Sequence, residues 1–125
     1  MKIHEYQAAQ LFQKYGIPTG GGQVASEVSD ALKIADQVGY PVVLKSQVLV
    51  GGRGKAGGVK VVKNKEELQK IFPEIRKLNI KGYPVEQILI VHAINIKKEY
   101  YAAITIDSTK DDVVIIASAE GGVEI

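Results

Sequence analysis

The sequence predicts an α+β domain with a largely antiparallel sheet. Apolar residues alternate between helical and strand-like spacing, in the order helix, strand, helix, strand, glycine-rich loop, strand, helix, strand and hairpin. Two pairs of successive strands are joined without a helix, by the glycine-rich loop at 51–58 and by a polar turn at 107–112. With 125 residues, the chain is long enough for one modest core.

The first helix is expected over residues 3–15, because its apolar side chains recur on one face. Gly16 and Pro18 follow it and favour a helix end. The apolar positions are Tyr6, Ala9, Leu11, Phe12 and Tyr15.

A short strand at 23–25 and a second helix at 27–38 come next. Ser26 is expected to cap this helix, and Gly39 and Pro41 to end it. Its inward-facing residues are predicted to be Ala31, Leu32, Ala35 and Val38.

Two apolar strands, 42–45 and 59–62, flank the glycine-rich loop. A third helix is predicted over 65–78, with Asn64 and Glu67 forming a capping box and Pro73 kinking or shortening it. Residues 81–84 are expected to be a connector.

The last predicted elements are a buried strand at 88–91 and a hairpin of strands 100–106 and 113–117.

Composition and charge give no indication of a nucleic-acid-binding, membrane-bound or secreted protein. The chain is 46% hydrophobic and 24% charged, and its net charge of +2 is too small to imply nucleic-acid or membrane binding. It has no cysteine, no signal or transit peptide pattern and no apolar run that spans a bilayer. We therefore expect a cytoplasmic protein, without a nucleic-acid or membrane partner.

The loop at 51–58 contains five glycines with Arg53 and Lys55. Glycines allow backbone N–H groups to approach an anion, and the two cations suit phosphate oxygens. A flexible hairpin tip is the alternative. The P-loop pattern is not met, since Leu49 and Ala56 replace its glycine and hydroxyl residue. A dinucleotide-binding string at 52–57 is rejected because a strand follows it instead of a helix.

Few other residues indicate chemistry. Lys45 ends an apolar strand at the mouth of the loop, where a ligand role and a surface role are equally favoured. His92 is expected to be a partly buried polar residue, and neither histidine has the spacing of a metal site. Glu120 and Glu124 are equally compatible with metal or substrate contacts and with exposure.

Several segments, taken together and in this order, resemble the β subunit of succinyl-CoA synthetases, a family of the ATP-grasp superfamily. They are residues 4–7, Lys45, 51–61, 96–101 and 119–125. The resemblance extends from Met1 to Ile125.

The resemblance implies an incomplete ATP-grasp fold over residues 1–125. The helix at 1–18 would pack on the second subdomain, 19–97 would form the first subdomain, and 98–125 would begin the second. The Glu-Gly-Gly motif near the end also leads us to expect that the natural chain continues.

The implied activity is that of an acid–thiol ligase of the tricarboxylic acid cycle. Such enzymes form succinyl-CoA reversibly from succinate, CoA and ATP or GTP, through a phosphohistidine on a partner α subunit. Mg²⁺ is expected as a cofactor with its ligands downstream of Ile125. No catalytic or metal residue is therefore assigned within this fragment, which alone is expected to be inactive.

The resemblance assigns nucleotide binding to five residues. Lys45 would contact phosphate and base, Gly52, Arg53 and Gly54 the phosphates, and Glu99 the ribose hydroxyls. From the residues alone, Glu99 is interpreted as an exposed ion-pairing residue beside Lys97 and Lys98 that contributes little stability.

One position departs from the family pattern. Val91 stands where a glutamate is expected near the adenine, so the preference for ATP or GTP stays open. The alternatives are a related malate– or citrate–CoA ligase and a nucleotide-binding or docking module without catalysis. Nonspecific nucleic-acid binding ranks last, because the chain has only two phenylalanines and no tryptophan.

Overall fold

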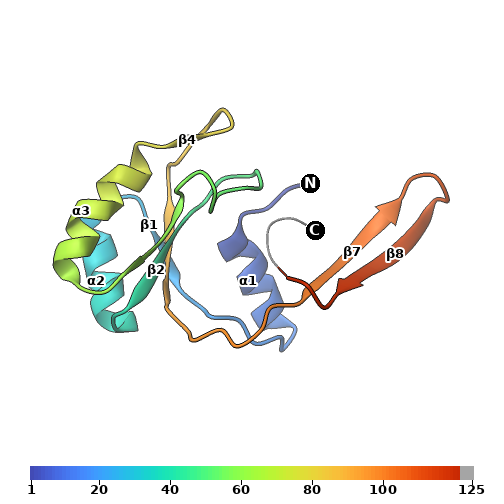
Figure 1. The fold of residues 1–125 in the computed structure, drawn as a ribbon, viewed down its shortest axis with the longest axis horizontal. Helices are drawn as coiled ribbons and strands as arrows, with labels where there is room; N and C mark the ends of the chain where they lie inside the picture. Colours follow the sequence, from blue (N-terminus) through green and yellow to red (C-terminus); the bar gives the residue numbers. More distant parts are fainter. Residues whose placement is uncertain (122–125) are drawn as a thin grey trace. The chain divides into compact units, whose positions relative to one another are not determined.

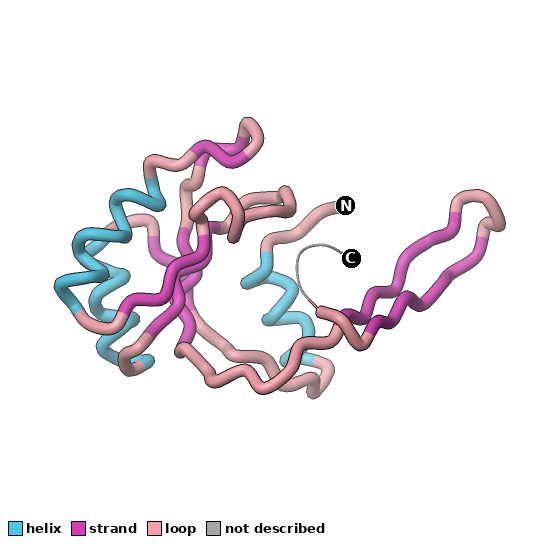
Figure 2. Tube along the Cα trace, viewed as in Figure 1, coloured by secondary structure: helices cyan, strands magenta, loops and turns pink. Residues whose placement is uncertain are grey.

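The computed structural model describes residues 1–121, which belong to two compact units, Met1–Ala93 and Ile94–Ile125. Figures 1 and 2 show the helices and strands of both units.

A four-stranded sheet forms the centre of the first unit. Its order is β1-β6-β2-β3, and each neighbouring pair is antiparallel, as the sequence predicts. The strands are β1 (Gln23–Ala25), β2 (Val42–Ser46), β3 (Val59–Val62) and β6 (Ile88–His92). The two central strands, β2 and β6, carry most of the buried strand residues.

Two helices, α2 (Val28–Val38) and α3 (Lys65–Arg76), pack side by side on one side of this sheet (Figure 1). Along β2, buried and half-buried residues alternate, so Val42, Leu44 and Ser46 point to one face and Lys45 to the other. The core therefore uses one face of the sheet, and Lys45 is directed away from it. Core residues include Ala31, Ile34, Leu44, Val62, Leu68, Phe72, Ile75 and Ile90.

Helix α1 (Glu5–Lys14) forms close to where the sequence predicts it, but it has no buried residue. Three of its five predicted apolar positions are exposed, since Leu11 is 49% accessible, Phe12 51% and Tyr15 78%. Tyr6 and Ala9 are partly buried. The spacing of apolar residues predicts the position of this helix correctly. It shows only that one face of the helix is apolar, and not whether that face is buried.

Other local predictions need correction. Ser26 does not cap α2, since the N-cap is Glu27 and no side chain there accepts a hydrogen bond. In α3, Asn64 caps as predicted, but Glu67 accepts from the backbone N–H of Lys63, so the reciprocal bond is displaced by one residue. The helix continues past Pro73 and ends at Arg76, two residues earlier than predicted.

The expected connector at 81–84 is part of a small hairpin. Strands β4 (Asn79–Ile80) and β5 (Tyr83–Pro84) pair antiparallel around Lys81 and Gly82, which both have positive φ. Such two-residue strands have no periodicity that a sequence could display.

The second unit contains the predicted hairpin of β7 (Tyr101–Asp107) and β8 (Asp112–Ser118). Asp107 accepts hydrogen bonds from the backbone and side chain of Thr109 and so holds the turn. One face consists only of exposed apolar residues, formed by the pairs Ala102–Ala117, Ile104–Ile115 and Ile106–Val113.

Across residues 1–121, no helix is long and apolar enough to cross a membrane.

A candidate phosphate site at the end of strand β2

Two cationic side chains meet at the end of β2 in the first unit. Lys45 Nζ lies 2.9 Å from Glu5 Oε1, and Arg53 Nη1 lies 2.8 Å from Glu5 Oε2. All three side chains are about a quarter to a third accessible, so the cluster is partly shielded and still open to a ligand. We call Lys45, Arg53 and Glu5 the cation cluster.

The strand register sets the position of Lys45 in the cation cluster. Lys45 pairs with Val59 of β3 on one side and Leu89 of β6 on the other, which makes it part of a central strand. Because strand side chains alternate, this register directs Lys45 away from the helices α2 and α3.

Arg53 reaches the same place from the loop. Its Nη1 also donates a hydrogen bond of 2.9 Å to the carbonyl oxygen of Ser46, the last residue of β2. This bond holds the guanidinium beside the strand end independently of Glu5. Arginine can donate several hydrogen bonds at once, so the remaining N–H groups can face an anion.

The loop 51–58 is closed by its own hydrogen bonds. The backbone N–H groups of Ala56, Gly57 and Gly58 donate to the carbonyls of Gly52, Gly54 and Arg53. Gly58 in turn accepts from Ser46 N–H at 2.7 Å, which joins the loop base to β2. The loop is thus a hydrogen-bonded turn rather than a plain hairpin tip.

Gly52 and Gly58 are required for different reasons. Gly52 has a φ of +84°, which favours glycine. At Gly58, an added Cβ would lie 2.3 Å from Ser46 Oγ and 3.1 Å from the carbonyl oxygen of Arg53. Any side chain at Gly58 would therefore push the loop base away from β2.

The cations stabilise the charged form of Glu5. Partial burial raises the pKa of this carboxyl group, but the hydrogen bond from Lys45 and the charges of Lys45 and Arg53 outweigh it. The net result is a pKa below the ordinary value, so Glu5 is ionised at neutral pH. The cluster then holds two positive charges and one negative charge, which leaves it a net attraction for anions.

The first turn of α1 is held to β2 by a second contact. Gln47 Oε1 accepts from Tyr6 N–H at 3.2 Å, while its Nε2 donates to the carbonyl oxygens of Lys45 and Ser46. Gln47 is only 4% accessible. Glu5 and Gln47 together therefore fix the helix N-terminus beside the cations.

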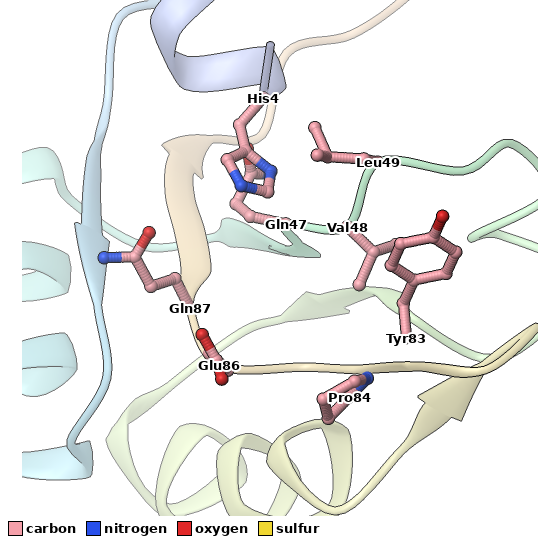
Figure 3. A pocket seen from close by; sticks show the side chains of 8 residues that line it. All are labelled: His4, Gln47, Val48, Leu49, Tyr83, Pro84, Glu86 and Gln87. Atoms are coloured by element: carbon pink, nitrogen blue, oxygen red, sulfur yellow. The ribbon is translucent and has the colours of Figure 1, made fainter. Parts of the chain in front are cut away.

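A cavity of about 260 Å³ adjoins this contact (Figure 3). Its walls come from the start of α1, the residues after β2 and the β5 region. The lining residues are His4, Gln47, Val48, Leu49, Tyr83, Pro84, Glu86 and Gln87. Its volume is below the range of pockets that hold a drug-sized ligand, so it does not replace the cation cluster as the candidate site.

The structure brings four of the five predicted site residues into one region, namely Lys45 and Arg53 with Gly52 and Gly54 in the same loop. Glu99 belongs to the second unit, where it is exposed just before β7. A Cβ on Gly121 would lie 2.5 Å from Glu99 Cβ, so a glycine there lets the chain pass Glu99.

Three other residues were candidates in the sequence, namely His92, Glu120 and Glu124. His92 is exposed, not partly buried, and its Nδ1 lies 3.0 Å from the carbonyl oxygen of Gly39. Glu120 is exposed, and its backbone N–H donates to Ser118 Oγ. Glu124 lies outside the described residues. Within residues 1–121, no three metal-ligating side chains come together.

Sequence reasoning missed Glu5 as a member of the site. It is separated from Lys45 by 40 residues and from Arg53 by 48, so no local spacing connects them. The only available signal was the motif at residues 4–7, which supported the family resemblance but gave Glu5 no role.

The chain is similar to curated proteins along its whole length. The β subunit of ADP-forming succinate–CoA ligase from Chloroflexus aggregans is 50% identical over 125 residues, covering 100% of this chain and 33% of that protein. The chain thus spans about a third of the length of such curated relatives.

Solved structures share the fold, and this chain covers a larger part of their length than of the curated relatives. The protein PH1788 from Pyrococcus horikoshii matches with a TM-score of 0.80 and 30% identity, over 97% of this chain and 53% of that one. A dinucleotide-forming acetyl-coenzyme A synthetase from Ca. Korarchaeum cryptofilum, solved with coenzyme A and Ca-AMPCP, matches with a TM-score of 0.78 and 25% identity, over 94% and 53%.

The family model for the ATP-grasp domain matches residues 2–125, which is nearly the whole chain. The matched range includes β2, the glycine-rich loop and β3, as well as the antiparallel sheet and the helices α2 and α3. The chain therefore belongs to the ATP-grasp domain family.

Proposed function

We propose that this chain is the nucleotide-binding N-terminal part of the β subunit of an ADP-forming succinate–CoA ligase. The observation that carries the proposal is the pair Lys45 and Arg53 at the end of β2, in a chain 50% identical along its length to such a subunit. Membership of the ATP-grasp family supports nucleotide binding.

In this proposal, the triphosphate of ATP or GTP lies against the cation cluster. Lys45 Nζ and the Arg53 guanidinium donate charge-assisted hydrogen bonds to phosphate oxygens. Gly52 and Gly54 contribute the backbone of the loop, where the absence of Cβ atoms lets the main chain approach the phosphates.

Ribose binding is assigned to Glu99. The Glu99 carboxylate can accept hydrogen bonds from both ribose hydroxyls, and Gly121 keeps the chain beside it free of a side chain. Glu99 then belongs to the expected second subdomain, which begins at residue 98. The expected helix at 1–18 and the expected first subdomain at 19–97 precede it.

The complete enzyme would join succinate and CoA in the cytoplasm, with a phosphohistidine carried by a partner α subunit. The Mg²⁺ that accompanies the nucleotide would neutralise phosphate charge. Residues 1–121 hold no group of three metal-ligating side chains. The Mg²⁺ ligands are expected downstream of Ile125.

The activity test uses the protein purified from its source cells with any subunit that accompanies it. We expect ADP release that requires ATP, CoA and succinate together, and a mass that includes a second subunit. Release with malate or citrate in place of succinate would reassign the acid. A lone chain that binds ATP without turnover would favour a nucleotide-binding module instead.

The site test measures ATP affinity by calorimetry in the Lys45→Ala and Arg53→Ala variants. Each is expected to weaken binding by about tenfold or more, because each removes a charged hydrogen-bond donor from the phosphates. Lys33→Ala is the matched control, since the Lys33 side chain is 75% accessible on α2 and forms an exposed ion pair with Asp30. Unchanged affinity in both site variants would refute the phosphate assignment.

The ribose assignment has its own test. Glu99→Ala is expected to weaken ATP binding while leaving the binding of inorganic triphosphate unchanged, because the latter has no sugar. Glu74→Ala, which removes an exposed carboxylate from α3, should change neither. Equal losses for both ligands in Glu99→Ala would place Glu99 near the phosphates.

A further inference from the structure

Glu5 occupies the place where an anion would bind. Its two carboxylate oxygens lie 2.9 Å from Lys45 Nζ and 2.8 Å from Arg53 Nη1, which are distances typical of bound phosphate oxygens. The carboxylate therefore uses the donors that the proposed function assigns to phosphates.

The two cations do not need Glu5 to be placed correctly. Lys45 is set by the register of a central strand, and Arg53 is held by the carbonyl oxygen of Ser46. Gln47 provides a separate anchor for the first turn of α1. Removing the charge of Glu5 would thus leave the donors in position and free of their carboxylate.

Glu5 Oε2 lies 2.8 Å from Arg53 Nη1, and the same nitrogen also donates to the carbonyl oxygen of Ser46. Arg53 therefore divides this donor between two acceptors, whereas Lys45 Nζ donates to Glu5 Oε1 at 2.9 Å. A ligand with several oxygens and a higher negative charge can make better-aligned bonds to both cations.

We propose that Glu5 is a built-in counter-anion that a polyphosphate must displace from Lys45 and Arg53 in order to bind. This inference rests on the proposed function, since it concerns the same cations. It makes Glu5 a determinant of nucleotide affinity, and it requires the Glu5 side chain to leave the cations while Gln47 still holds the first turn of α1 beside β2.

A structural role and a competing role of Glu5 predict opposite effects of its loss on ligand binding. If Glu5 only supported the site, its loss would disorder the cations and weaken binding. If Glu5 competes with the ligand, its loss removes a like charge from the phosphates and strengthens binding.

The test measures binding of inorganic triphosphate by calorimetry, using the protein as it is isolated from cells. Glu5→Gln keeps the shape of the side chain and removes its charge, and we expect binding about tenfold tighter than in the parent protein. Glu5→Ala should also bind more tightly, so the result does not rest on one variant. Thermal unfolding of each variant verifies that it is folded.

Glu66→Gln is the matched control. Glu66 is an exposed carboxylate in the first turn of α3, so its replacement makes the same change of net charge at a comparable helix position. We expect its affinity to be within twofold of the parent, since general charge effects are small at a distance. Equal tightening in Glu66→Gln and Glu5→Gln would overturn the inference.

Unchanged or weaker binding in folded Glu5→Gln and Glu5→Ala would also overturn it. Failure of the proposed function is recognised separately, because Lys45→Ala and Arg53→Ala would then bind ATP as well as the parent protein does. Tighter binding in the Glu5 variants together with weaker binding in the Lys45 and Arg53 variants would support both proposals.

Discussion

At the scale of single residues, Glu5 is the side chain for which the proposals predict two opposed effects. Its contacts with Lys45 and Arg53 tie α1 to the end of β2, and the helix has no buried residue of its own. In the proposed function, the same contacts occupy the donors that phosphates would use. Stability and nucleotide affinity are thus expected to change in opposite directions when Glu5 is replaced.

Glu5→Gln should lower the free energy of unfolding by about 1 kcal/mol at pH 7, as expected for a partly exposed ion pair. The folded-state pKa of Glu5 is lowered, so the charged carboxylate contributes fully above the pKa of the unfolded chain, about 4.3. The contribution is lost as the pH falls through the folded-state pKa. Urea unfolding of both proteins from pH 7 to pH 3 checks this, and a difference that persists unchanged at pH 3 would contradict it.

At the scale of elements, the glycine-rich loop depends on its junction with β2. Gly58→Ala should destabilise the protein by about 1–3 kcal/mol, because the added Cβ would meet Ser46 Oγ at 2.3 Å and the Arg53 carbonyl at 3.1 Å. Gly51→Ala is the matched control, since nothing lies within 4 Å of its Cβ and its φ is not positive. Similar losses for the two variants, measured by thermal unfolding, would show that the loop base is not closely packed.

Helices α2 and α3 of the first unit begin differently, although the sequence predicts a polar N-cap side chain for each. Asn64→Ala should cost about 1 kcal/mol, because Asn64 Oδ1 accepts from Glu67 N–H at 2.9 Å. Ser26→Ala should cost little, since the N-cap of α2 is Glu27 and no side chain caps it. Chemical unfolding of both variants tests the difference, and a larger loss in Ser26→Ala would contradict it.

Local signals explain why most elements were predictable. Apolar spacing located α1, α2 and the strands, and Gly39 and Asn64 marked helix boundaries with side-chain or backbone chemistry of their own. Contacts between distant residues left no such signal. The meeting of Glu5 with Arg53 depends on the register of β2 and on the path of the loop, and the two-residue strands β4 and β5 depend on pairing alone.

At the scale of the whole molecule, the two units differ in how much of their apolar surface is buried. The first unit has a core between a four-stranded sheet and two helices, which includes the fully buried Leu44 and Ile90. The second is a two-stranded hairpin with Ile104, Ile106 and Ile115 each more than 70% accessible. An isolated hairpin is marginally stable in water, so the second unit contributes little stability of its own.

Amide hydrogen exchange should therefore separate the two units of the 125-residue chain. Amides of β2 and β6 are expected to exchange only through global unfolding, because both strands are hydrogen-bonded on two sides in the core. Amides of β7 and β8 should exchange at least 100-fold faster, the effect of about 3 kcal/mol less protection. Equal protection of the two units in the 125-residue chain would instead mean that the hairpin is already held by contacts as stable as those of the core.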